Sequence, residues 1–298
     1  MNYQTFKKNV LKHISASVQN GQKVVLQPII KNNGTVYDGL IILDPILNIS
    51  PTIYLNPYYH RHLNGIPMED IYEDILATYY QNLPQKDFDI SLFRDFEKAK
   101  ERIVFKLVNK ERNQELLQDI PHVDFQDLAL IFICTVTDFM NTYATILIHN
   151  THLALWNTTT EVLYKTAMEQ TPALLPHRLN CMEDLLEYTE RETFASFADL
   201  NMYILTNKLK IYGAACIAYP NLLKRISDFL EDNLIILPSS IHEVLILPEK
   251  TARLEYEMEE LDAFITDINE TELTDDEILS DHAYLYERET GILTYKSE

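Results

Sequence analysis

Apolar residues recur every three or four positions in several segments of the chain, the spacing that places them on one face of an α-helix. Within residues 3–18, Phe6, Val10 and Ile14 follow this spacing, and lysines take positions between them. We expect helices in these segments: 3–18, 68–82, 158–176, 220–232 and 251–269.

The ends of two helices are indicated by specific residues. Thr158-x-x-Glu161 has the spacing of a capping box and opens the helix at 158. Either Pro172 or Pro176 ends that helix, because the residue before a proline disfavours helical geometry. A second Thr-x-x-Glu pattern predicts a short helix at 274–277, and we assign no element to the remaining tail.

Shorter apolar runs predict β-strands. Two runs within residues 22–43 flank Asn32, Asn33 and Gly34, which predicts a β-hairpin around a glycine-containing turn. Residues 95–109 change from helix to strand near Arg102. Further strands are expected at 51–55, 127–137, 144–156, 201–207, 212–219, 233–238 and 243–248. In this prediction the segment 144–156 folds back on itself at residues 149–152.

Strand pairs alternate with helices along the chain. This order predicts an α+β fold with mainly antiparallel, meander-like sheets, packed amphipathic helices, and helices near both ends. We expect an N-terminal α/β module at 1–120, a C-terminal α+β module at 121–270, and an acidic C-terminal tail with a short helix at 271–298.

The stretch "LPSSIHEVLILP" at 237–248 contains the residue types of a hydrolytic triad. On an extended strand, Ser240 and His242 share a face and Glu243 points away, so the carboxylate could not orient the imidazole. Ser240-x-x-Glu243 also has capping-box spacing, which favours one short helical turn between two strands. That interpretation leaves His242 as the side chain free to meet a ligand, and catalysis by Ser240, His242 and Glu243 is the alternative.

Two histidine pairs are candidate metal ligands. His60 and His62 share a face only on a strand, and Gly65, a plausible helix C-cap, favours a helix that separates them. His149 and His152 would face each other across a tight hairpin turn. Because neither pair has a recognisable third ligand, we predict no metal site.

Other polar groups flank apolar strands and could perform acid–base chemistry if they converged. Turn closure and capping are the more common roles of Asp and Asn there. These groups are Asp124, Asp127, Asn201, Asn207, and the pair Asp281 and His282. Cys216, within an apolar run, is expected to be a small core residue.

Common cofactor signatures are absent from the sequence. The six glycines are too dispersed to form GxGxxG or GxxxxGK[ST], and GxSxG, HExxH and EF-hand patterns do not occur. We therefore expect no cofactor and assign no catalytic residue.

The formal net charge of −20 is unevenly distributed and argues against binding to duplex nucleic acid. The first 37 residues contain five lysines and no acid, whereas residues 251–298 contain 15 acids and 3 basic residues. This acidic C-terminal region is interpreted as a solvated face, as a docking surface for a basic protein partner, or as a clamp onto the lysine-bearing N-terminal helix.

The cellular setting is predicted from features that are missing. No apolar run approaches the roughly 20 residues needed to span a bilayer, and residues 1–18 lack the continuous apolar core of a secretory signal. The three cysteines are scattered and form no CxxC pair. We expect a cytoplasmic protein that does not bind membranes.

Several phrases of the sequence resemble one known family when taken together. They are "SPTIYLNPYY", "ATILIHNTHLALW", "MYILTNKLKIYGAACIAYP", "LPSSIHEVLILP" and "ILSDHAYLYER". Their order and spacing resemble a bacterial family of domains of unknown function (number five-six-eight-eight), across nearly the whole chain. The resemblance implies a bacterial, cytoplasmic protein and brings no activity, cofactor or catalytic residue with it.

Together these observations favour an interaction or regulatory binding module over an enzyme. The absence of a catalytic signature and the acidic C-terminal region support that hypothesis. The alternative is a hydrolase that uses Ser240, His242 and Glu243.

Overall fold

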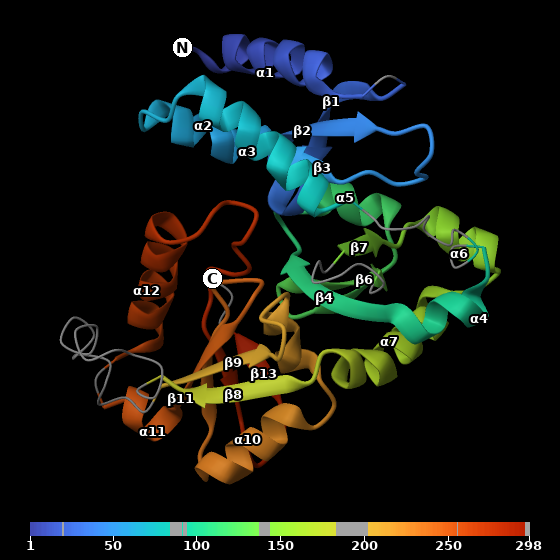
Figure 1. Ribbon diagram of the computed structural model, residues 1–298. Coiled ribbons are helices and arrows are strands. Elements are labelled where there is room, and N and C mark those ends of the chain that lie inside the picture. Colours follow the sequence, from blue (N-terminus) through green and yellow to red (C-terminus); the bar gives the residue numbers. More distant parts are fainter. Residues whose placement is uncertain are drawn as a thin grey trace. The chain divides into compact units, whose positions relative to one another are not determined.

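The computed structural model has the predicted α+β architecture, with antiparallel strand pairs in each described sheet (Figure 1). It describes residues 1–19, 21–83, 91, 94–136, 144–182, 202–254 and 256–295. The chain divides into two compact units: unit 1 is Met1–Ser91 with Val136–Ala144, and unit 2 is Leu92–Thr135 with Thr145–Glu298.

Unit 1 contains a three-stranded sheet in the order β1-β2-β3, covered by helices (Figure 1). Its elements are α1 (Tyr3–Ser17), β1 (Lys23–Ile30), η1 (Asn32–Gly34), β2 (Val36–Leu43), β3 (Thr52–Tyr54), α2 (Leu55–Leu63) and α3 (Met68–Gln81). The predicted hairpin is confirmed, and its turn places Asn33 and Gly34 at positive φ, which both residue types tolerate.

The apolar face of α1 forms part of the core of unit 1. The side chain of Asn2 accepts a hydrogen bond from Thr5 N and caps the helix, and Phe6 and Val10 are fully buried. On the same helix, Lys7 Nζ lies 2.9 Å from Oδ2 of Asp38, the first acid in the chain. One lysine of the N-terminal cluster therefore has its partner within unit 1.

A four-stranded sheet begins unit 2. Its strands are β4 (Ile103–Asn109), β5 (His122–Phe125), β6 (Leu128–Val136) and β7 (Ala144–Leu147). The accompanying helices are α4 (Phe96–Ala99), η3 (Lys100–Arg102), α5 (Gln114–Asp119), α6 (Asn150–Trp156) and α7 (Thr160–Leu174). The helix-to-strand change near Arg102 is confirmed, and β4 pairs with β6, so strands on both sides of residue 120 share one sheet.

A six-stranded sheet completes unit 2, in the order β13-β12-β10-β11-β9-β8. The strands are β8 (His177–Cys181), β9 (Tyr203–Asn207), β10 (Leu234–Leu237), β11 (Val244–Pro248), β12 (Tyr284–Tyr286) and β13 (Leu293–Tyr295). The helices are η4 (Gly213–Ala218), α10 (Leu222–Leu230), α11 (Glu249–Ala252) and α12 (Met258–Thr271).

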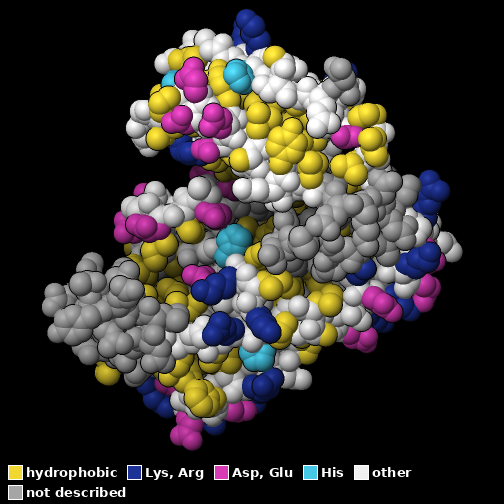
Figure 2. Space-filling view, in the orientation of Figure 1, with side chains coloured by type: hydrophobic (Ala, Val, Ile, Leu, Met, Phe, Trp, Pro, Cys, Tyr) yellow, Lys and Arg dark blue, Asp and Glu magenta, His cyan; other side chains and the backbone are white. Residues whose placement is uncertain are grey.

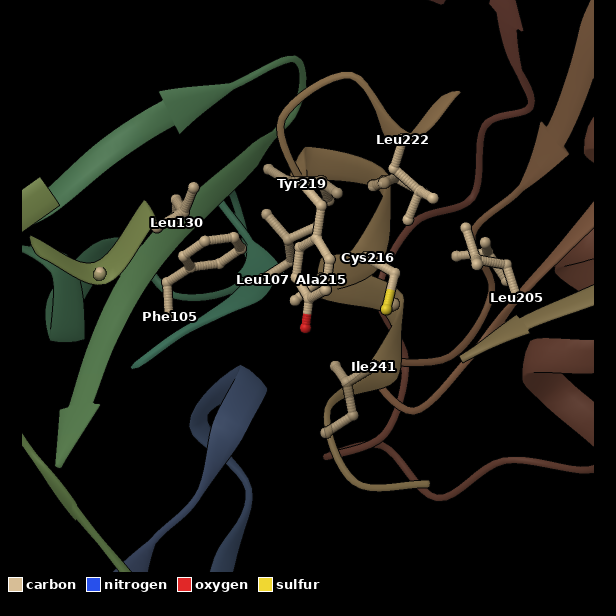
Figure 3. Close-up of a cluster of buried hydrophobic side chains, with 14 of the residues drawn as sticks. Phe105, Leu107, Leu130, Leu205, Ala215, Cys216, Tyr219, Leu222 and Ile241 are labelled. Atoms are coloured by element: carbon tan, nitrogen blue, oxygen red, sulfur yellow. The ribbon is translucent and has the colours of Figure 1, made fainter. Parts of the chain in front are cut away.

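The short helix η4 lies at the centre of the main core of unit 2. In Figure 3, Phe105 and Leu130 of the four-stranded sheet approach η4 from one side, and Leu205 of the six-stranded sheet lies on the other. Phe105 meets Tyr219 edge-to-face, with ring centroids 5.8 Å apart. Because η4 carries small residues such as Ala215, the two sheets can share one continuous apolar core.

Two predicted strands were wrong. Within residues 212–219, Gly213–Ala218 form η4, because Tyr212 turns the chain with a left-handed φ of 54° and donates its backbone N–H to His242 instead of to a neighbouring strand. The second half of 144–156 is α6 rather than a returning strand. Both segments are short apolar runs, for which periodicity does not distinguish strand from helix.

Other predicted boundaries also differ from the structure. Helix α7 is capped by Thr159 rather than Thr158, and it includes Pro172 and ends before Pro176. The segment 251–269 is split between α11 and α12, which leaves Leu254 84% exposed. The predicted helix at 274–277 is a hydrogen-bonded turn, and the tail provides β12 and β13.

Within the described ranges, no helix combines the length and apolar character required to cross a bilayer.

Candidate functional site

The connection between β10 and β11 places the candidate triad residues, and it does not assemble them as a triad. Instead of a helical turn it forms a bend, in which the backbone N of His242 donates to Ser240 Oγ at 3.0 Å. Ser240 is buried and pairs with Ile278, whereas Glu243 is exposed. Ser240 therefore satisfies a backbone group, although the expected capping box with Glu243 is absent.

The ring of His242 is held by two other segments. Its Nδ1 accepts a hydrogen bond from the backbone N of Tyr212 at 3.3 Å, which leaves the proton of a neutral ring on Nε2. Nε2 lies 3.9 Å from Oε1 of Glu277. The Tyr212 ring stacks on the imidazole at 5.9 Å, and Lys106 Nζ lies 4.3 Å from the centre of the same Tyr212 ring.

This arrangement does not suit His242 to act as a base toward Ser240. The nitrogen that could accept a proton already accepts one hydrogen bond, and the other faces a carboxylate. The carboxylate partner is Glu277 rather than the predicted Glu243. The sequence indicated no link between His242 and a residue 35 positions later.

The loop that contacts His242 is tightly packed. A Cβ on Gly213 would lie 2.4 Å from the carbonyl oxygen of His242 and 2.8 Å from the backbone N of Asn207. Asn207 is fully buried and bonds three backbone groups between Leu209 and Ile211. Asn207 therefore braces the loop, as expected for an asparagine at a strand end.

His149 and His152 lie together at the start of α6 rather than across a hairpin. His149 is the N-cap residue, and its backbone N donates to Nδ1 of His152 at 2.9 Å, while its carbonyl accepts from His152 N. Burial lowers the pKa of His152, and the charge of His149 lowers it further. The pair caps a helix, and within the described part of the chain no three His, Cys, Asp or Glu side chains are grouped to hold a metal ion.

The lowered pKa of His152 predicts an acid-sensitive helix start. Because the folded pKa lies below the ordinary value of 6.5, the unfolded chain binds this proton first, and stability falls as the pH decreases from 6.5 through the folded pKa. A His152→Gln variant keeps a side chain that can accept the N-cap bond and does not titrate. We expect its urea midpoint to fall less between pH 7.5 and pH 5 than that of the wild type.

The matched control is His60→Gln, which removes an exposed histidine. If the wild type and His152→Gln lose stability equally on acidification, burial of His152 does not contribute to the acid sensitivity.

His60 and His62 lie on α2, as the helical interpretation predicted. The helix ends in a Schellman motif around Gly65, with Ile66 N bonded to Arg61 O at 3.2 Å. His62 Nδ1 donates to Ile66 O, and His60 is exposed. His62 therefore helps to close the end of the helix, and α2 separates it from His60.

The remaining polar candidates are also distributed among separate contacts. Lys110 Nζ lies 2.7 Å from Oδ2 of Asp124, and Arg112 pairs with Asp281 at 2.9 Å. The ring of His282 lies beside that of Tyr295. Cys216 is a core residue, and burial raises the pKa of its thiol to about 12. Asn201 lies outside the described residues.

Asp127 connects the two sheets of unit 2. One of its carboxylate oxygens accepts the hydroxyl of Tyr284, and the other accepts Ser280 Oγ at 2.7 Å. Tyr284 has no exposed surface, and burial raises its pKa well above the ordinary value, helped by the nearby charge of Asp127. The nearby Asn109 Nδ2 donates to Leu279 O at 3.0 Å. This network fastens β12 to the four-stranded sheet.

A charged cavity of about 540 Å³ lies elsewhere in unit 2. Its walls come from Lys224 and Asp228 of α10, the turn 231–233, Lys250 in α11 and the turn 287–290 between β12 and β13. Asn233 joins three of these walls, because Oδ1 accepts from Arg288 N at 2.8 Å and Nδ2 donates to Glu249 at 2.8 Å.

The cavity contains more acids than cations. Lys224 and Arg288 both pair with Asp228, at 2.5 and 3.0 Å, and their hydrogen bonds lower the pKa of that carboxyl. Lys250 pairs with Asp232 at 3.6 Å. Five acids against three cations line the walls, which leaves a net charge of −2. The acids without a cation partner among the described residues are Glu231, Glu287 and Glu289.

Comparison with known proteins identifies the chain. The sequence pattern of a family of unknown function (DUF5688) matches residues 3–288. The chain belongs to this family. The family match confirms the resemblance seen in the sequence and covers both units. No curated protein and no solved structure matches the chain.

Much of the acidic C-terminal region of this DUF5688 member is folded. Helix α12 buries Leu261 and Ile265 and exposes acids that include Glu259, Glu260 and Glu270. The turn that follows β12 brings Glu287 and Glu289 to the cavity. The charge of this region is visible in the sequence, whereas the cavity is not, because its walls are distributed over about 65 positions with no recurring motif.

Proposed function

We propose that this protein is an interaction module that docks a basic segment of a partner protein on its acidic C-terminal region, with the charged cavity receiving a Lys or Arg side chain. The observation that carries the proposal is the set of three acids without a cation partner in the cavity wall, on a chain of net charge −20. A cationic side chain entering there would gain opposite charge in a partly enclosed site.

The walls support this proposal because they are fixed by hydrogen bonds before any partner arrives. The carboxylate of Asp232 accepts hydrogen bonds from Asn233 N at 2.9 Å and from Lys250 N at 3.0 Å. The side chain of Asn233 in turn accepts a hydrogen bond from Arg288 N. Glu231, the C-cap residue of α10, takes a left-handed conformation at φ 56°. A site that is already ordered loses less entropy on binding.

Substitution of the cavity acids tests the proposal. The probe is a fluorescein-labelled peptide of alternating arginine and glycine, measured by anisotropy at low and moderate salt. We expect Glu287→Gln/Glu289→Gln to weaken binding by about tenfold, since both carboxylates line the same cavity and would act together on one cation bound there. Deletion of the C-terminal region is unsuitable because β12 pairs with β10 in the sheet.

The matched control, Glu270→Gln/Glu272→Gln, also removes two negative charges. Glu270 lies in the last turn of α12, Glu272 follows the helix, and both are exposed. We expect this control to weaken binding by about twofold or less, as for exposed, screened charges. Equal weakening by both variants would show that binding is diffuse and that the cavity is not the docking site.

The alternative function is hydrolysis through Ser240, His242 and Glu243. The arrangement of His242 is unfavourable for it, and the one feature in its favour is a carboxylate, Glu277, 3.9 Å from the imidazole. Ser240→Ala and His242→Ala test it. We expect both variants to lower the free energy of unfolding by about 1 kcal/mol, because each loses a hydrogen bond to a backbone N–H group. We expect hydrolysis of p-nitrophenyl acetate by the wild type and both variants to be equal. Activity lost in the variants at unchanged stability would favour the hydrolase.

A further inference from the structure

We infer that the loop 208–212, between β9 and η4, is a second docking surface, and that it binds a short acidic segment of a partner protein with an apolar side chain between its carboxylates. The loop shares no residue with the charged cavity and has the opposite charge.

The loop is held in place because Asn207 and His242, which lie outside it, accept hydrogen bonds from every backbone N–H between Leu209 and Tyr212. Asn207 Oδ1 accepts from Leu209 N at 3.0 Å and from Ile211 N at 3.4 Å, and its carbonyl accepts from Lys210 N at 3.0 Å. Tyr212 N donates to His242. Lys210 and Tyr212 both take left-handed conformations, at φ 56° and 54°, which bulky residues rarely adopt. Such strain is typical of functional sites.

The loop displays cations that have no carboxylate partner among the described residues. Lys208 and Lys210 are exposed. The backbone N–H of Lys208 donates to the carbonyl of Pro176, the residue before β8, and Arg178 of β8 pairs with Thr206, two positions before Lys208. Burial lowers the pKa of the neighbouring His177, and the charge of Arg225 in α10 lowers it further. Figure 2 shows Lys and Arg side chains gathered over β8 and β9 on the face in view. On a chain of net charge −20, this is a local reversal of sign.

The side chains of the loop favour a peptide over a nucleic acid. Leu209 lies between the two lysines and is 48% exposed, so the surface offers an apolar contact flanked by positive charge. The aromatic ring nearby offers no free platform for bases, because the rings of Tyr212 and His242 stack on each other and Lys106 Nζ lies over the Tyr212 ring. The acidic remainder of the chain would repel a long polyanion.

A short synthetic peptide tests this inference. The probe is fluorescein-labelled Glu-Glu-Leu-Glu-Glu with an amidated C-terminus. It is compared with the same peptide carrying serine at the centre and with a labelled five-nucleotide oligothymidylate, whose four phosphates match the four carboxylates. We expect saturable binding of the leucine peptide, weakened by about tenfold or more in Lys208→Glu/Lys210→Glu. The control Lys8→Glu/Lys12→Glu changes two exposed lysines of α1 and should alter binding by about twofold or less.

Leu209→Ser provides an independent measurement. It should weaken binding of the leucine peptide by about threefold and leave binding of the serine peptide unaffected. The effect of the Leu209→Ser change would then depend on the central residue of the peptide, and attraction between charges alone does not produce such a dependence. If Lys208→Glu/Lys210→Glu lowers the melting temperature, Lys208→Gln replaces it, since Lys208 has ordinary backbone geometry. Absence of saturable binding, equal binding by the two double variants, absence of this dependence on the central residue, or equally tight binding of the oligonucleotide would each overturn the inference.

Discussion

Gly213→Ala is expected to lower the free energy of unfolding by about 3 kcal/mol or more, because overpacking against backbone atoms cannot be relieved by a side-chain rotation. The new Cβ would lie 2.1 Å from Thr206 Oγ1, 2.4 Å from His242 O and 2.8 Å from Asn207 N. Relief would require η4 to move away from β9 and from the bend at His242. Urea unfolding followed by far-ultraviolet circular dichroism measures the loss.

Two controls separate crowding from backbone strain. Gly65→Ala meets no atom within 4 Å and differs only in its φ of +95°, so it should cost about 1 kcal/mol. Thr206→Ala added to Gly213→Ala removes one of the three clashes and should restore little, because the two backbone contacts remain. A Gly213→Ala protein as stable as the wild type would mean that η4 and β9 are not in close contact.

Asp127→Ala is expected to cost about 2–5 kcal/mol, since it leaves the hydroxyls of Tyr284 and Ser280 without their acceptor. Tyr284→Phe removes one donor and leaves a half-buried carboxylate that water can reach, so it should cost about 1–1.5 kcal/mol. Equilibrium unfolding in urea measures both variants.

The double variant Asp127→Ala/Tyr284→Phe tests whether the two groups act on each other. We expect it to be more stable than the sum of the single losses predicts, by about 1 kcal/mol or more, because Tyr284→Phe removes a hydroxyl that Asp127→Ala would leave unsatisfied. Strict additivity would show that the Tyr284–Asp127 hydrogen bond does not contribute to stability.

Local patterns predicted much of the fold because the relevant physics is local. The buried face of α1 repeats every three or four residues, and the hairpin turn needs only Asn33 and Gly34 at positive φ. The segment 212–219 failed because its conformation depends on contact with His242, about 30 positions away, and residues 144–156 failed because His152 caps a helix that the apolar pattern also fits.

The candidate site could be predicted only in part for the same reason. That Ser240 binds a backbone N–H group followed from its spacing. His242 was expected to be free to meet a ligand, and this prediction was wrong because Tyr212 N donates to its ring and Glu277 faces its other nitrogen. Glu277 and Tyr212, which hold the ring, are distant in sequence and carry no motif. The cavity acids were visible as net charge, whereas their convergence depends on the pairing of β10 with β12.

The place of β12 in the six-stranded sheet has a consequence for synthesis on the ribosome. The elements of unit 1 between Tyr3 and Gln81 contact one another locally, so they can fold while the rest of the chain is still being translated. In unit 2, β10 lacks its neighbouring strand β12 until residue 286 has emerged. The side chain of Asn109 likewise cannot donate its hydrogen bond to Leu279 O until the chain has grown by 170 residues. The nascent chain therefore exposes the edge of β10 until residues 284–286 have emerged, and during this interval the edge is open to pairing with strands of other chains.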